Sequence, residues 1–350
     1  MKVEELLGQS GEWLKGTGND SDVVISSRIR LARNLHRFPF LTVATPAVRS
    51  EIEKFIRPRL ENTRLPRKLN YWSLPEITLI ERTLLVERHL ISKEHAQAEG
   101  DRGVAVAGDE AISIMVNEED HLRLQVIRSG LQLDEAFEEI DRMDTALESQ
   151  LHYAFHPRFG YLTACPTNVG TGLRISVMMH LPAAVLSKQM DKVLQSLQRL
   201  NYTVRGFYGE GTSPLGDFYQ VSNQVTLGKS ERDIIAEMKK VVPEILKFER
   251  SWRVKLLEDE PRKIEDRVWR AYGVLKHARR ITSEEATELL SAVRLGMNMN
   301  LLTGIPPKVI NELFLVTQPS HLQKIERRVL EPDERDVVRA DFIRRKLEGL

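Results

Sequence analysis

The 350-residue sequence contains one cysteine, Cys165. An internal disulfide and a Cys-rich zinc site are therefore excluded, and so little cysteine is typical of a reducing compartment. Lys and Arg number 51 against 50 Asp and Glu, so the formal charge is only +1. Such a balance provides no overall field that would draw the molecule onto nucleic acid or anionic lipid, and neither is an expected partner. Any affinity for phosphate must come from a local cluster.

Long hydrophobic runs are also missing. The most apolar stretch, residues 175–186, is shorter than a bilayer span and is interrupted by His180 and Pro182. The N-terminus carries Glu4 and Glu5 and lacks the basic flank and apolar core of a signal peptide. Hydrophobic residues make up 41% and charged residues 29%, the balance of a folded globular protein. We expect a cytoplasmic protein without a membrane segment.

The pattern of the sequence changes near Gly228, which predicts two domains, 1–228 and 229–350. Strand-like runs in the first part are 77–81, 84–87, 104–107, 112–116 and 122–127, and helical spacing occurs at 48–60, 133–154 and 184–200. This mixture predicts an α+β fold, with an antiparallel β-sheet flanked by helices. The second part shows only helical spacing, at 231–248, 262–278, 284–297, 309–315 and 335–347. An all-α C-terminal domain is therefore expected.

Two common ways of holding a nucleotide are absent, because the sequence has neither a G-x-x-x-x-G-K-[ST] loop nor the H-R-D and D-F-G motifs of protein kinases. Arginines are the alternative. Arg28 and Arg30, in the run SSRIR, share one face of an extended segment because strand side chains alternate. A guanidinium can bind phosphate oxygens in pairs. Two solvated surface arginines remain the alternative interpretation.

An acidic cluster follows the fourth strand-like run, in the sequence NEEDHLR at 117–123. A solvated turn is the simpler interpretation. The functional one places a carboxylate at the mouth of the sheet and Arg123 on the next strand, so that one site holds both a base and a phosphate ligand.

Two glycine-bearing loops complete the candidates. In CPTNVGTGLR, at 165–174, Cys165 precedes a polar loop rather than lying in an apolar strand, and Arg174 ends the loop where an anion could bind. Nearby positive charge would favour its thiolate, and the glycines permit close approach of a ligand to the backbone. In RGFYGEGT, at 205–212, Glu210 lies at the centre, and a plain flexible turn is the alternative.

Together, SSRIRLARN, NEEDHLR and above all CPTNVGTGLR resemble the phosphagen (guanidino) kinases, the family of arginine kinase and creatine kinase. The resemblance covers residues 20–228 and implies the catalytic-domain fold of that family. Small-substrate members carry a helical domain ahead of the first arginine motif, whereas here a helical domain follows. This arrangement is similar to the bacterial branch that phosphorylates arginine side chains of proteins, and RDVVRA at 335–340 resembles its phosphoarginine-binding motif.

The resemblance implies transfer of the γ-phosphoryl group from ATP, with Mg²⁺, to a guanidinium nitrogen of a protein arginine, and no structural metal. Glu119 would be the base, Cys165 a thiolate beside the guanidinium and Glu210 the second substrate carboxylate. Tyr208 and Ser213 stand where arginine kinases have an arginine and that second carboxylate, so the role is shifted within the loop to Glu210. The implied ATP-binding residues are Ser26, Ser27, Arg28, Ile29, Arg30, His89, Arg123, Arg174, Ile175, Ser176, Val177, Met178, Arg205, Gly206, Phe207, Tyr208, Gly209 and Glu210.

A second site is implied near the C-terminus. Arg335, Asp336, Arg339 and Ala340 would bind phosphoarginine and couple it to activity or assembly, whereas the residues alone favour a generic arginine-rich helix. The implied partners are protein substrates with exposed arginines, a heat-shock transcriptional repressor, a Clp ATPase and protease, a zinc-binding activator protein and a second copy of the chain, as a homodimer or higher oligomer. A small-guanidino phosphagen kinase and a phosphoarginine-binding adaptor are the alternative functions.

Overall fold

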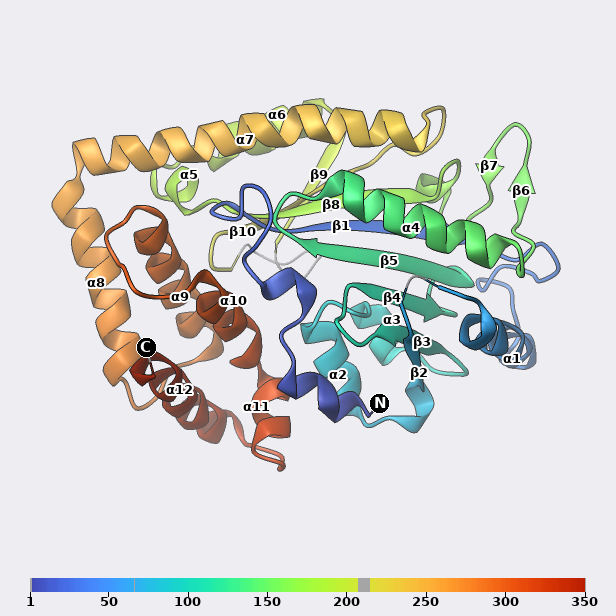
Figure 1. Cartoon of the computed structure of the whole chain (residues 1–350), viewed down its shortest axis with the longest axis horizontal. Helices are drawn as coiled ribbons and strands as arrows, with labels where there is room; N and C mark the ends of the chain where they lie inside the picture. The colour runs from blue at the N-terminus through green and yellow to red at the C-terminus, as the bar shows by residue number, and fades with distance from the viewer. Residues whose placement is uncertain (1, 66, 207–214, 350) are drawn as a thin grey trace.

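The computed structural model describes residues 2–65, 67–206 and 215–349. A single antiparallel sheet of eight strands runs through the molecule in the order β2-β3-β4-β5-β1-β8-β10-β9 (Figure 1). The strands are β1 Val24–Arg33, β2 Leu69–Ser73, β3 Gly103–Ala107, β4 Ile112–Val116, β5 Leu122–Ser129, β8 Leu173–His180, β9 Tyr202–Arg205 and β10 Phe218–Asn223. A separate hairpin joins β6 Phe155–His156 to β7 Gly160–Tyr161.

Helices cover one face of the sheet along its length. Strand alternation directs Ile29 and Leu31 of β1 and Ile175 and Val177 of β8 into a core under these helices. Figure 1 shows α4 and α7 lying along this face. The helices that supply this core are α1 Pro46–Asn62, α4 Leu133–Glu148, α5 Pro182–Leu186, α6 Met190–Arg199 and the first half of α7 Glu231–Asp259.

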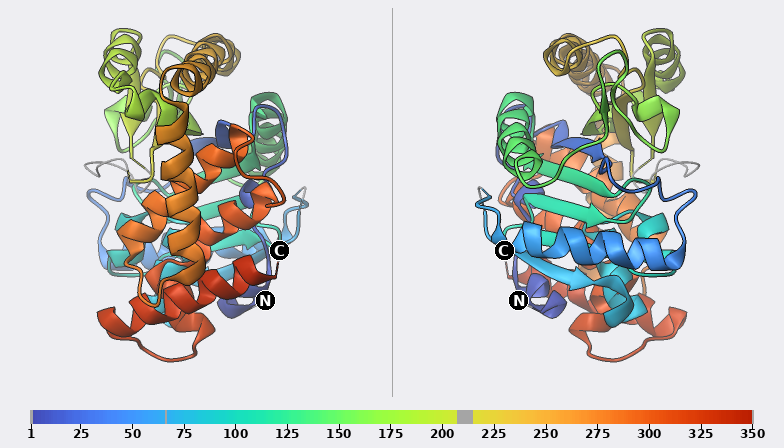
Figure 2. Two further views of the ribbon diagram at one scale, coloured as in Figure 1. Left: turned by 90° about the vertical axis from the view of Figure 1, so that its left-hand side faces the viewer. Right: turned by 90° about the vertical axis from the view of Figure 1, so that its right-hand side faces the viewer.

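On the opposite face, the helices of the described residues lie at its two sides. At one side, α2 Leu79–Glu87 and α3 Lys93–Gln97 pack on β3 and β4, with the short 3₁₀ helices η1 Val3–Gly8 and η3 Leu74–Glu76. At the other side lie the C-terminal helices and η2 Glu12–Leu14, which gather at one end of the molecule (Figure 2). They are α8 Pro261–His277, α9 Ser283–Asn298, α10 Pro307–Val316, α11 Pro319–Ile325 and α12 Pro332–Glu348. The part of the sheet between these two groups carries the arginines.

A buried ionic network joins the C-terminal helices to the rest of the protein. Arg88 donates to Glu110 from Nε at 3.0 Å and approaches Nε2 of His321 at 3.1 Å, and all three side chains are buried. Glu87 accepts hydrogen bonds from the backbone N–H groups of Ser320 and His321, at the start of α11. Buried charges of this kind are tolerated because each has a partner.

Most of the predicted elements are confirmed, including an α+β sheet domain and a C-terminal region whose regular elements are all helical. The strands expected at 77–81 and 84–87 are wrong, because this stretch contains helix α2. Thr78 starts it with a capping box, accepting from the N–H of Glu81 at 3.3 Å while the Glu81 carboxylate accepts from the N–H of Thr78 at 2.8 Å. The helix expected at 184–200 is broken, since Lys188 has the left-handed φ of 55° between α5 and α6. Helix α11 was not predicted, and the boundary at 228 stays a prediction.

Candidate active site

The central strand β1 brings the arginines together. Hydrogen-bonded on both sides, it places Arg30 opposite Arg174 of β8 and Ala32 opposite Arg123 of β5. Arg205, at the end of β9, lies opposite Gln220 of β10. Because alternate residues share a face, these side chains project from one side of the sheet. A cleft of about 960 Å³ lies there and is lined by six arginines, of which Arg102 precedes β3 and the other five are Arg28, Arg30, Arg123, Arg174 and Arg205.

Like charges lie close together in this cleft. Burial and then Arg123, Arg174 and Arg205 lower the pKa of Arg28 to about 9. Burial, followed by the nearby charges of Arg28, Arg123 and Arg174, holds the pKa of Arg30 well below its ordinary value. In the part of the chain that the structure describes, Nε of Arg30 is buried and has no hydrogen-bond partner. A polyanion such as a nucleoside triphosphate fits this set of donors.

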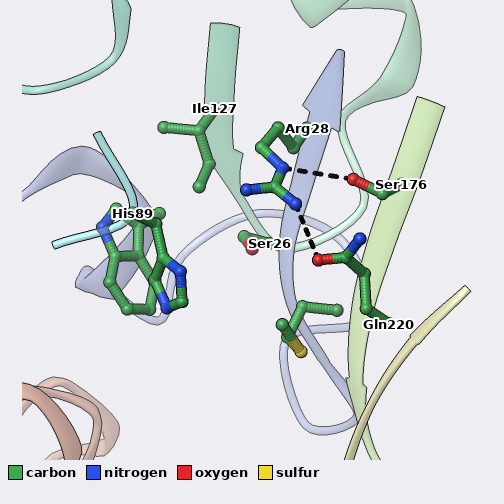
Figure 3. A pocket seen from close by; sticks show the side chains of 8 residues that line it. Ser26, Arg28, His89, Ile127, Ser176 and Gln220 are labelled. Carbon is green, nitrogen blue, oxygen red and sulfur yellow. Dashed lines mark hydrogen bonds between the residues drawn. The ribbon is translucent and has the colours of Figure 1, made fainter. Parts of the chain in front are cut away.

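Arg28 also borders a small cavity of about 10 Å³ that adjoins the cleft (Figure 3). Its Nε donates to Oγ of Ser176 at 3.2 Å and its Nη2 to Oε1 of Gln220 at 2.7 Å. His89 lines both spaces, with its ring edge-on to Trp13 at 5.0 Å between centroids. Burial and the nearby Arg28 lower the pKa of His89 to about 3, so its imidazole is neutral at physiological pH.

The β4–β5 turn holds two neighbouring glutamates in different environments. Glu118 accepts from Nη1 of Arg123 and from Oγ of Ser92, each at 2.7 Å. Burial raises its pKa, but Arg123, Ser92 and the N–H of Glu119 outweigh that effect and bring the pKa to about 2. Glu119 is exposed to the cleft, and among the described residues its carboxylate accepts no hydrogen bond. Withdrawal from water, with Asp120 and Glu118 nearby, raises its pKa despite Arg123. Glu119 therefore has the greater proton affinity.

Asp120 ties this turn to the loop that carries the thiol. Its Oδ1 accepts from the N–H of Ala164 at 2.7 Å and from Nδ2 of Asn34 at 2.5 Å. Cys165 is half-buried at the start of the 3₁₀ helix η4 Pro166–Asn168, and its Sγ lies 3.0 Å from Oγ1 of Thr167. The thiol and Glu119 line the same cleft as a result.

The glycines of this loop approach the protein's own backbone. A Cβ on Gly170, where φ is 114°, would lie 2.5 Å from the carbonyl oxygen of Thr226. One on Gly172, where φ is 64°, would lie 2.6 Å from that of Ala32. Both positions therefore require glycine because of the protein's own backbone, and the expected close approach of a ligand stays a prediction.

The other residues assigned to the nucleotide fall into three groups. Ser26, Ser176 and Met178 line the small cavity beside Arg28. Four more, Ser27, Ile29, Ile175 and Val177, direct their side chains to the opposite face of the sheet, so only their backbone is on the side of the cleft. Gly206 ends a described segment, and Phe207, Tyr208, Gly209 and Glu210 lie outside the described residues. The assignment of Glu210 as second carboxylate stays a prediction.

The C-terminal motif lies on α12 within the helical bundle. Arg339 is buried and donates to the carbonyl oxygens of Thr317 at 2.9 Å and Ile281 at 2.8 Å, and to Asp336 at 2.7 Å. Arg335 donates to the carbonyl oxygen of Leu330 at 2.9 Å. Arg335 and Asp336 are half-buried, and Ala340 is fully buried. Phosphoarginine binding by these four residues stays a prediction.

Sequence reasoning missed Glu118 as the partner of Arg123, and Ser92 and Gln220 entirely. Ser92 does carry a signal, because it caps α3 by accepting from the N–H of His95 at 3.0 Å. Gln220 carries none, since FYQVSN is an ordinary strand sequence.

Among the described residues, no three His, Cys, Asp or Glu side chains are arranged to hold a metal ion. No described helix is long and apolar enough to span a membrane.

Comparisons with known proteins agree with this geometry. Residues 51–252 match the family model of the ATP:guanido phosphotransferase C-terminal catalytic domain, and residues 261–350 match that of the protein-arginine kinase McsB C-terminal domain. The chain is 45% identical to the protein-arginine kinase of Halothermothrix orenii, over 99% of both chains. It is 47% identical to that of Desulforamulus reducens, over 100% of this chain and 99% of the relative.

Solved structures show the same fold. A lombricine kinase aligns with a TM-score of 0.61 at 26% identity, covering 71% of this chain and 73% of the other. The duplicated taurocyamine kinase of Schistosoma mansoni aligns with a TM-score of 0.60 at 25% identity, covering 65% of this chain and 33% of the other. The chain thus belongs to the ATP:guanido phosphotransferase family of kinases, and within it to the protein-arginine kinases.

Proposed function

We propose that this protein is an ATP-dependent protein-arginine kinase, which transfers the γ-phosphoryl group of MgATP to a guanidinium nitrogen of arginine side chains in proteins. One observation carries the proposal: a single cleft is lined by six arginines, by the exposed Glu119 and by Cys165. The names of the relatives support protein arginine as the acceptor.

The arginines serve the donor side of the reaction. Phosphoryl transfer needs positive charge around the migrating group and its leaving oxygen, because negative charge shifts between them in the transition state. Arg28, Arg30 and Arg174 present such charge from adjacent strands, and Arg123 presents it from β5. Mg²⁺ would arrive with the triphosphate and share its oxygens, the ligands this ion prefers.

Glu119 serves the acceptor side. A guanidinium has no free lone pair at neutral pH, so it must lose a proton to become a nucleophile. As its nitrogen attacks phosphorus, the N–P bond forms, the bond between the γ-phosphorus and the bridging oxygen of ADP breaks, and the proton passes to the Glu119 carboxylate. Glu119 is suited to this role because its pKa is raised while that of Glu118 is lowered to about 2 by Arg123.

Cys165 supplies a further anion in this scheme. As a thiolate, it would stabilise the acceptor guanidinium through charge and would form no covalent bond. Asp120 holds its loop against the Glu119 turn, which supports a joint action of the two groups on one guanidinium.

We also propose the wider setting that the motif resemblance implies. The protein would act in the cytoplasm, a location supported by its single cysteine, on a heat-shock transcriptional repressor and on proteins destined for a Clp ATPase and protease. A zinc-binding activator would assist it, it would assemble as a homodimer or higher oligomer, and Arg335, Asp336, Arg339 and Ala340 would bind phosphoarginine. These proposals are supported by the likeness of RDVVRA at 335–340 to the bacterial branch.

The test is incubation of the purified protein with MgATP and an unfolded arginine-rich protein, with free arginine in parallel. Phosphorus NMR and mass spectrometry at neutral pH would then locate the phosphate. Acid-labile phosphate on protein arginine and none on free arginine is the expected result. Phosphate on free arginine alone would identify a small-guanidino kinase, and intact phosphoarginine binding without transfer would point to an adaptor or to a missing activator.

A further inference from the structure

Arg28 is held differently from Arg123, which lines the same cleft. Arg123 pairs with the Glu118 carboxylate, whereas Arg28 donates to the Ser176 hydroxyl and the Gln220 amide oxygen, both of which are neutral (Figure 3). Within the described residues Arg28 has no ion-pair partner, and the charged groups that act on it are arginines. Its charge is therefore available to a ligand.

Gln220 is fixed in the orientation that this contact requires. It projects from β10 on the same face as Arg28 and is 7% exposed. Its Nε2 donates to Oγ of Ser222 at 3.3 Å, which directs Oε1 toward the guanidinium. The reversed amide would place N–H donors against the N–H donors of Arg28, which is unfavourable.

A carboxylate in the same place would act differently. Glutamate has nearly the shape of glutamine and could accept the same hydrogen bond, but it would form an ion pair with Arg28 and compete with phosphate. An apolar side chain would leave Arg28 without its 2.7 Å acceptor among neighbouring arginines that repel it. Only a neutral acceptor both positions the guanidinium and preserves its charge.

We propose that Gln220 is a positioning residue for phosphate binding, which holds the Arg28 guanidinium through a neutral acceptor so that its full positive charge faces the nucleotide. This inference deepens the proposed function and rests on it for the identity of the nucleotide. Ser176 assists from β8, and Gln220 borders both the cleft and the small cavity beside it.

The test compares Gln220→Glu, Gln220→Met and Ser222→Ala. Ser222→Ala is the milder variant, because it removes the 3.3 Å contact to the Gln220 amide but keeps the Gln220 oxygen that accepts from Arg28. Affinity for MgATP is measured by calorimetry without any acceptor, and kinetics then give KM for MgATP and for the acceptor protein. Circular dichroism verifies folding.

Both Gln220 variants should raise the Kd for MgATP on the order of tenfold, the size expected for a hydrogen bond to a charged group, with KM for the acceptor unchanged. Ser222→Ala should raise the Kd for MgATP no more than about twofold, because the N–H donors of Arg28 still disfavour the reversed amide when the longer contact to Ser222 is lost. A Gln220→Glu variant that binds MgATP normally would overturn the inference, because a merely structural glutamine tolerates that change. If Gln220→Met fails to fold, the other two variants still decide. MgATP binding without transfer to protein arginine would contradict the proposed function but leave the Gln220 comparison readable.

Discussion

Replacing each of the two adjacent glutamates by glutamine should separate the chemistry of the cleft from its stability. Glu119→Gln removes the proposed base while leaving the arginines in place. We expect kcat to fall by about 10²–10⁴-fold, the contribution of a general base, with little change in the Kd for MgATP. Calorimetry and a phosphoarginine assay on the same preparation give both numbers.

Glu118→Gln is the matched control, because it removes the charge that compensates the buried Arg123. The lowering of the Glu118 pKa from 4.5 to about 2 corresponds to about 3 kcal/mol, close to the cost of breaking a buried ion pair. Urea unfolding should show a loss of this size for Glu118→Gln and almost none for Glu119→Gln. The assignment is refuted if Glu119→Gln turns over at nearly the original rate, or if Glu118→Gln abolishes transfer without loss of stability.

Three further predictions concern other parts of the site. Cys165→Ala should lower kcat about tenfold without abolishing transfer, since one electrostatic contact is lost, and intact mass spectrometry should find no phosphorylated thiol on the original protein. The contribution of Glu118 to the free energy of unfolding is fully present above pH 4.5 and is lost as the pH falls toward 2, because the folded state lowers the pKa of this carboxyl. Unfolding measured over this pH range should show the loss in the original protein and not in Glu118→Gln. Gly172→Ala should reduce the free energy of unfolding by at least about 1–3 kcal/mol, since φ there is 64° and the new Cβ would meet Ala32, whereas a wild-type unfolding midpoint would contradict this account.

The fold was predictable where local pattern and tertiary environment agree. The run 112–116 is apolar except for Ser113 and the run 122–127 alternates, and they form β4 and β5 because both lie inside the sheet. The run 84–87 is just as apolar, but its leucines form one face of α2, whose start is set by the Thr78 capping box. A short apolar run does not distinguish these cases.

The site was predictable where residues belong to contiguous motifs. Arg28, Glu119, Cys165 and Arg174 were all named from such motifs, and the structure brings them to one cleft. Gln220 could not be found in this way, because its role depends on the register that sets β10 beside β8. A hydrogen bond between strands that are far apart in sequence leaves no local trace.

The position of β1 between β5 and β8 has a consequence for how such a kinase can change its targets. Its arginines are rooted in backbone that is hydrogen-bonded along both edges, whereas Glu119 and Cys165 stand on turns at the margin of the sheet. The residues that bind the phosphoryl donor therefore belong to the sheet itself, whereas those that act on the acceptor belong to turns beside it. Altered turns can admit a new class of acceptor while the machinery that handles the nucleotide is inherited unchanged.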